Sequence, residues 1–211
     1  MPELIQGIDP VGVRERLAAV RTEAGEGVRI LVATKYVPDS ELAVLAEAGV
    51  DLVGENRLDD LERKYELCGE LFEWHFIGAL QSRKVKGVLP LVSLIHSVAS
   101  ESALDQVNSR AAEGTRILIQ VNVAGEDSKE GVGPADLGGF ISRSEVEVAG
   151  LATMPPFAED PEASRRHFAR LAEFAAEHGL VELSMGTSQD WRVAVDEGAT
   201  IIRLGSALLR S

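Results

Sequence analysis

Eight short apolar runs rich in valine, isoleucine and leucine recur along this chain and constrain its fold more than any other feature. Longer stretches with apolar residues at helical spacing separate them, which is the pattern of βα units around a parallel sheet. Two of these helical stretches end at glycine, SELAVLAEAG at Gly49 and SRRHFARLAEFAAEHG at Gly179, where a helix cap is expected. The runs cover residues 28–35, 50–56, 72–78, 92–98, 115–123, 146–154, 180–186 and 199–205.

Eight strands with intervening helices in 211 residues predict an α/β fold, a (β/α)8 barrel. A further helix over about residues 10–24 is expected before the first strand. An open doubly wound sheet is the alternative, but ATKYVPDS follows the first strand where that fold carries a glycine-rich fingerprint. We expect residues 1–211 to form a single domain, because no Pro-rich, Ser-rich or repeated segment indicates a linker.

Composition and charge exclude several classes of partner. The net charge of -13 repels phosphate backbones and anionic lipid, which argues against nucleic-acid and membrane binding. No apolar run approaches the roughly 20 residues that span a bilayer. A single cysteine, Cys68, cannot form an internal disulfide, and the first residues lack a secretion signal, so a cytoplasmic location is predicted.

Lys35 stands apart from the other lysines, because it ends the first apolar run. Strand alternation puts it on the same side as Leu31 and Ala33, which directs it along the barrel axis. An amine that is partly desolvated there is suited to forming a Schiff base. A solvated lysine at a strand end is the alternative. Polar, helical or loop surroundings are expected for the remaining four, Lys64, Lys84, Lys86 and Lys129.

The segments SMGTSQDW (184–191) and IIRLGSALL (201–209) predict an anion site. Each ends a strand and begins a helix with glycine and small hydroxyl residues, so backbone N–H groups, hydroxyls and a helix dipole converge. Phosphate sites in barrels are frequently built from the loops after strands seven and eight. The alternative is that Thr187 or Ser188, together with Ser206, only caps a helix.

Three further polar residues are expected inside the barrel or at its mouth. Arg203 lies in an otherwise apolar strand, so its guanidinium must meet either a ligand or an acceptor such as Glu55. His75 and His96 close the third and fourth runs, without the clustered ligands of a barrel metal site. We interpret both histidines as hydrogen-bonding pocket residues and predict no metal.

Eight ordered segments, running from about residue 28 to the end, together resemble the pyridoxal phosphate homeostasis proteins, also described as proline synthetase co-transcribed homologues. The resemblance implies a fold-type III barrel similar to the N-terminal domain of alanine racemase, with pyridoxal 5′-phosphate (PLP) held as a Schiff base on Lys35. It also implies Asn56 beside the cofactor ring, Arg203 facing the pyridine nitrogen, and Ser188, Gly205 and Ser206 on the phosphate. The segments are LVATKYVP, GEN, WHFIGALQSRK, HSV, IQVNVAGEDSKEGV, GLATMPP, LSMGTSQDW and GATIIRLGSALL.

The implied function is intracellular PLP homeostasis, in which a monomeric carrier or reservoir supplies the cofactor to apo-enzymes without catalytic turnover. A small PLP-dependent racemase and a Schiff-base aldolase are the alternatives. A racemase of this fold draws a second base from a C-terminal β domain and a partner subunit, for which this chain has no room. An arginine at the pyridine nitrogen also weakens the electron sink.

The chain departs from the family pattern in two places. Thr187 stands where the family usually has methionine, which adds a hydroxyl near the expected phosphate. The chain stops at ALLRS, so we expect a short final helix and a less well covered barrel closure. Lys129, in the loop after the fifth strand, is either a solvated surface residue or a second amine near the barrel mouth.

Overall fold

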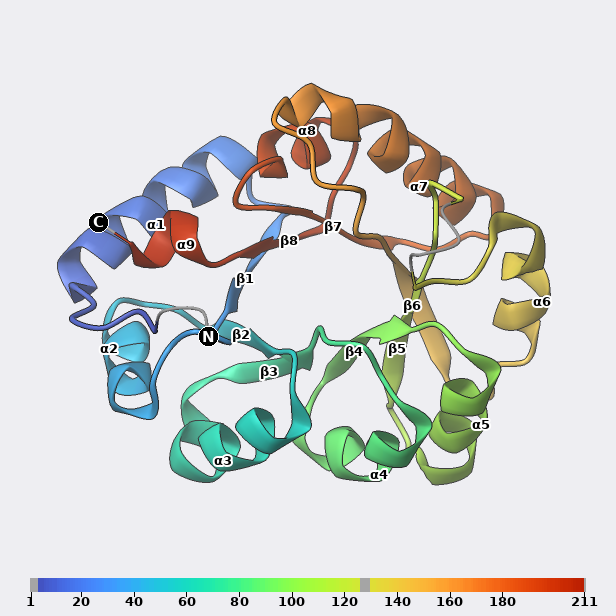
Figure 1. Ribbon diagram of the computed structural model, residues 1–211, viewed down its shortest axis with the longest axis horizontal. Coiled ribbons are helices and arrows are strands. Elements are labelled where there is room, and N and C mark those ends of the chain that lie inside the picture. Colours follow the sequence, from blue (N-terminus) through green and yellow to red (C-terminus); the bar gives the residue numbers. More distant parts are fainter. Residues whose placement is uncertain (1–3, 126–129, 211) are drawn as a thin grey trace.

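The computed structural model describes residues 4–125 and 130–210, which form a closed barrel of eight parallel strands in sequence order (Figure 1). Each strand coincides with one predicted run, and pairing of the first strand with the last closes the sheet. The barrel is therefore confirmed, and the open doubly wound sheet is wrong. The strands are β1 (Arg29–Ala33), β2 (Leu52–Glu55), β3 (Glu73–Phe76), β4 (Leu94–Val98), β5 (Arg116–Gln120), β6 (Glu147–Ala152), β7 (Glu182–Thr187) and β8 (Ile201–Leu204).

The α-helices lie around the outside of the strand ring (Figure 1). The first of them precedes β1 and begins where the Asp9 carboxylate accepts the backbone N–H groups of Val11 and Gly12, both at 3.0 Å. In the described ranges, no helix combines the length and apolarity needed to cross a membrane. The helices are α1 (Pro10–Ala24), α2 (Leu42–Glu47), α3 (Leu58–Cys68), α4 (Val85–Val88), α5 (Glu101–Arg110), α6 (Leu137–Ser142), α7 (Arg165–Glu177), α8 (Trp191–Asp196) and α9 (Ser206–Leu209).

Two apolar layers lie on opposite faces of the strands, because successive side chains of a strand alternate between faces. The larger layer packs between the strands and the helices. A smaller one fills the barrel interior. Gly54 leaves room for it, since a Cβ there would approach Leu31 Cδ2 to 2.6 Å. The interior residues are Leu31, Leu52, Leu94, Leu118, Ala149, Ala152 and Ile201.

The last helix is short, as the sequence predicts, with four residues in α9. Leu208 and Leu209 on it are nevertheless buried, and α9 lies beside α1 (Figure 1). The side chain of Arg16 on α1 donates a hydrogen bond to the Leu208 carbonyl at 2.8 Å. Contacts between α1 and α9 therefore cover this end of the barrel despite the short final helix.

Candidate functional site

Three of the residues predicted to bind a cofactor follow neighbouring strands at the carboxyl end of the barrel. Val32 of β1 pairs with Leu204 of β8, and Ala33 pairs with Gly54 of β2. Gly205 follows this pairing directly, and a Cβ on it would lie 3.6 Å from the Ala33 carbonyl. Since Lys35 and Asn56 each stand two residues beyond the Ala33–Gly54 pair, the strand order brings Gly205, Lys35 and Asn56 to one rim.

Lys35 itself differs from the expectation, because β1 ends at Ala33 and the lysine lies in the turn that follows. Its side chain is exposed, and its Nζ lies 4.9 Å from the centroid of the Tyr36 ring. The predicted desolvation of the amine is therefore wrong, and the alternative of a solvated lysine describes its surroundings. What distinguishes Lys35 is its place on the rim.

Among the lysines that the structure describes, Lys64 is the buried one, which sequence reasoning missed. It lies on α3 with 2% of its side chain exposed, and its Nζ is 2.5 Å from Glu55 Oε1. The same Nζ donates to the Thr34 carbonyl at 2.7 Å, while Thr34 Oγ1 donates to Glu55 Oε1 at 2.8 Å. These hydrogen bonds among Thr34, Glu55 and Lys64 link the ends of β1 and β2 to α3, immediately before Lys35 and Asn56 in the chain.

Arg203 lies inside the barrel near its mouth and is 8% exposed. Its guanidinium donates to the Ser184 carbonyl at 2.8 Å, to Ser184 Oγ, and to the Thr153 carbonyl at 2.8 Å. Burial lowers the pKa of Arg203 to about 10, with the Asp190 charge acting in the opposite direction, so it stays protonated at neutral pH. The alternative partner Glu55 is wrong, because that carboxylate is engaged by Lys64.

A hollow of about 170 Å³ opens beside Arg203 at this end of the barrel. His96 reaches it from β4, so one predicted pocket histidine does line the mouth. The lining combines the Arg203 cation with apolar side chains and the amide of Gln120. Such a lining suits a polar aromatic ligand. It is lined by Ile77, Ala79, His96, Gln120, Glu130, Ala152, Thr153, Met154 and Arg203.

The loops after β7 and β8 meet as predicted. Ser188 Oγ accepts the backbone N–H of Gly205 at 3.2 Å and that of Ala207 at 3.3 Å, and Ser206 is exposed beside them. The helix-capping alternative for Ser188 thus has support, since these amides lie at the start of α9. Thr187 does not add a free hydroxyl, because its Oγ1 donates to Asp190 Oδ1 at 3.0 Å.

His75 and His96 contact each other in the barrel interior, with His96 Nε2 2.9 Å from His75 Nδ1. Burial lowers the pKa of both rings, although the Glu73 carboxylate opposes this at His75. The hydrogen-bonding interpretation is confirmed for both residues, but His75 lies deeper and does not line the hollow. Within the part of the chain that the structure describes, no His, Cys, Asp or Glu cluster is arranged to hold a metal ion. Lys129 lies outside the described residues.

Comparison with known proteins agrees with this barrel. Residues 8–210 match the family of the alanine racemase N-terminal domain. The "pyridoxal phosphate homeostasis protein" of Aquifex aeolicus is 39% identical, and the match covers 93% of each chain. The protein of the same name from Deinococcus radiodurans is 38% identical, with 93% and 95% covered. The chain belongs to the pyridoxal phosphate homeostasis protein family. This confirms the resemblance seen in the sequence.

Solved structures give the same result. PipY of Synechococcus elongatus, determined with PLP bound, is 30% identical with a TM-score of 0.84, covering 93% of this chain and 99% of PipY. Alanine racemase from Corynebacterium glutamicum is 19% identical with a TM-score of 0.73, covering 95% of this chain and 60% of that one. The second likeness concerns the fold alone, and it confirms the predicted similarity of the barrel.

Proposed function

We propose that this chain, acting as one barrel domain, binds PLP at the carboxyl end of its strands and serves as a carrier or reservoir of the cofactor. The observation that carries the proposal is the shared rim. The neighbouring strands β7, β8 and β1 carry an accessible amine, a buried guanidinium and a serine-glycine loop toward the same end of the barrel. These groups match the aldehyde, the ring nitrogen and the phosphate of PLP, and PipY, a relative, has been determined with PLP bound.

At the reactive end, Lys35 would hold PLP as a Schiff base between its Nζ and the aldehyde carbon of the cofactor, with one water lost. Exposure of the amine supports this role, because an entering cofactor can reach it. Asn56, on the neighbouring rim position, contacts the ring. The Tyr36 ring against Lys35 restricts where the amine lies.

At the ring nitrogen, Arg203 would donate a hydrogen bond and so hold the cofactor in one orientation. When bound, PLP supplies an electron sink, whose strength depends on protonation of that nitrogen. A guanidinium whose pKa is about 10 does not release its proton at neutral pH, so the nitrogen stays unprotonated. This weakens the sink and favours storage of the cofactor over carbanion chemistry.

At the phosphate, we assign Ser188, Gly205 and Ser206. Ser188 Oγ accepts the N–H groups of Gly205 and Ala207, so its own hydroxyl hydrogen and the exposed hydroxyl of Ser206 are the donors that suit an anion here. The neighbouring hydroxyl of Thr187 is directed to Asp190, so it does not take part.

The two tyrosines of the chain also favour a carrier over a racemase. Tyr36 adjoins Lys35 on the same turn, and Tyr65 on α3 packs 6.0 Å from the Trp74 ring on the outer side of the barrel. Neither is arranged as a second base facing the far side of the cofactor. Holding a cofactor without a positioned acid or base does not stabilise a transition state. We further propose that the protein is a monomer in the cytoplasm and that it passes PLP to apo-enzymes.

The test is a PLP titration followed by isotope exchange. The protein is loaded with stoichiometric PLP, as judged from its absorbance spectrum, and incubated in heavy water with alanine and other amino acids. We expect binding without multiple-turnover exchange of the α-hydrogen. Exchange that proceeds over many turnovers and disappears in Lys35→Ala would restore the racemase alternative. Absence of binding would defeat the proposal altogether.

A further inference from the structure

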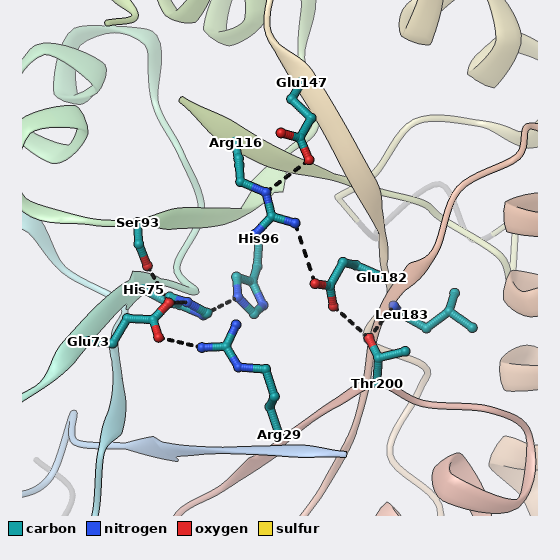
Figure 2. Close-up of polar contacts among 10 residues, drawn as sticks. All are labelled: Arg29, Glu73, His75, Ser93, His96, Arg116, Glu147, Glu182, Leu183 and Thr200. Atoms are coloured by element: carbon teal, nitrogen blue, oxygen red, sulfur yellow. Dashed lines mark hydrogen bonds and ion pairs between the residues drawn. The ribbon is translucent and has the colours of Figure 1, made fainter. Parts of the chain in front are cut away.

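Polar side chains form a continuous hydrogen-bonded path through the barrel. Arg203 near the mouth donates to Ser184 Oγ, which lies 2.8 Å from His96 Nδ1. His96 Nε2 is 2.9 Å from His75 Nδ1, and His75 Nε2 is 3.0 Å from Glu73 Oε1. Figure 2 shows the part of this path from Glu73 to His96, with His75 between them.

The path ends at the opposite face of the barrel from Arg203. Glu73 is the first residue of β3, and its side chain is 42% exposed. Arg29 at 2.5 Å and Ser93 at 2.7 Å donate to it (Figure 2). The hydrogen bond from His75 is the main reason that the pKa of Glu73 lies well below its usual range, so the carboxylate is ionised at neutral pH.

The charges at the two ends give every hydrogen bond in the path a direction. An ionised Glu73 can only accept, so His75 carries its proton on Nε2. A neutral ring has one N–H, so His75 Nδ1 accepts from His96 Nε2–H, and His96 Nδ1 in turn accepts from the Ser184 hydroxyl. Ser184 Oγ then accepts from Arg203, which can only donate.

We propose that Ser184, His96, His75 and Glu73 are positioning residues, which hold the Arg203 guanidinium in place through this one-way chain of hydrogen bonds. The inference rests on the proposed contact between Arg203 and the ring nitrogen of PLP. Through the chain, a carboxylate on one face of the barrel orients the group that meets the cofactor on the other. Hydrogen bonds in such a series also polarise one another.

Protonation of either histidine ring breaks the chain. The charged groups facing His75 are Glu73 on its own strand, Arg29 on β1 and Glu182 on β7. His96 faces His75 and the cations Arg203 and Arg29. A proton added at His75 Nδ1 removes the acceptor of His96 Nε2–H, and a proton added at His96 Nδ1 removes the acceptor of the Ser184 hydroxyl, so acid loosens Arg203.

The direct test reads the tautomers of the two rings in cofactor-free protein by two-bond ¹⁵N–¹H NMR with ¹⁵N-labelled histidine. His75→Gln and His96→Asn assign the signals. We expect both rings to be neutral at pH 7.5 with the proton on Nε2. An Nδ1–H tautomer or an imidazolium at either position overturns the proposal, whether or not the protein binds PLP.

The second test changes the remote end of the chain. Glu73→Leu removes the final acceptor, whereas Glu73→Gln keeps an oxygen there, and Glu182→Leu removes a carboxylate of the same face that lies outside the chain. We expect Glu73→Leu to alter the His75 tautomer and to weaken PLP binding about three- to tenfold. Glu73→Gln retains most of the affinity, and Glu182→Leu leaves the tautomers unchanged.

The outcomes separate this proposal from the proposed function. Failure of the wild-type protein to bind PLP would contradict the proposed function. The histidine tautomers would still show whether the one-way chain of hydrogen bonds exists. If the Glu73→Leu variant is folded, binds PLP with the affinity and spectrum of the wild type, and keeps the wild-type histidine tautomers, the positioning role is overturned.

Discussion

At the scale of single residues, we expect Lys64 to contribute more to the free energy of unfolding than any other lysine that the structure describes. Lys64→Met leaves the fully buried carboxylate of Glu55 without its cation and removes one of the two donors to the Thr34 carbonyl, which keeps the Val37 N–H. Breaking a buried pair by removing one partner costs about 3–5 kcal/mol. We therefore expect a loss of this size in the free energy of unfolding, measured by urea denaturation.

The matched control is Lys86→Met, which removes an exposed lysine from α4 and should change the stability by less than about 0.5 kcal/mol. In the double variant Glu55→Leu with Lys64→Met, neither charge of the pair remains buried without its partner, so much of the loss should be recovered. Equal stability of Lys64→Met and Lys86→Met would contradict the importance of the buried pair.

Ser206 tests the phosphate assignment, also at the residue scale. Ser206→Asp places a negative charge at the exposed start of α9, beside the amides that contact Ser188. Because like charges repel, we expect PLP binding to weaken about tenfold or more in a fluorescence titration. Ser109→Asp, on the exposed surface of α5, is the control for net charge. If both variants bind PLP as the wild type does, the phosphate lies elsewhere.

At the scale of elements, the turn after β7 depends on Gly186. Its φ is +88°, and a Cβ there would approach Ala194 Cβ to 2.6 Å and Trp191 Cα to 3.0 Å. Gly186→Ala therefore combines backbone strain with overpacking against α8, and we expect a loss of about 2–4 kcal/mol in the free energy of unfolding. Displacement of the Ser188 loop should weaken PLP binding as well.

Gly114→Ala provides the comparison for the element scale, because Gly114 has a φ of +83° but no atom within 4 Å of the added Cβ. It carries the backbone strain alone, about 1–2 kcal/mol. The prediction for the turn is wrong if chemical denaturation gives the two variants the same loss.

At the scale of the whole molecule, the sequence predicted the barrel well because its signals are repeated. Eight apolar runs of strand length, each followed by a helical stretch, leave few other folds, and the rim residues follow from where each run ends. The same reasoning extended β1 to Lys35, although the strand ends at Ala33. Thr34 is buried and its hydroxyl donates a hydrogen bond to Glu55. Strand alternation does not reveal this tertiary contact.

Two parts of the site depend on contacts that sequence patterns do not contain. The burial of Lys64 had a weak signal, since it stands three residues after the buried Leu61 on the same face of α3. The path through His75 and His96 joins strands that are far apart in the sequence, so only the closed barrel brings Ser184 to His96.

The central claim for the whole molecule is that PLP is held through Lys35, and chemical trapping tests it most directly. The protein is loaded with PLP, reduced with borohydride, digested and mapped by mass spectrometry. Reduction converts the linkage to a stable secondary amine, so the modified lysine keeps the pyridoxyl group. The account predicts a stoichiometric label on Lys35 and little on Lys64, Lys84, Lys86 or Lys129. A principal label on any other lysine, or none at all after demonstrated binding, would contradict it.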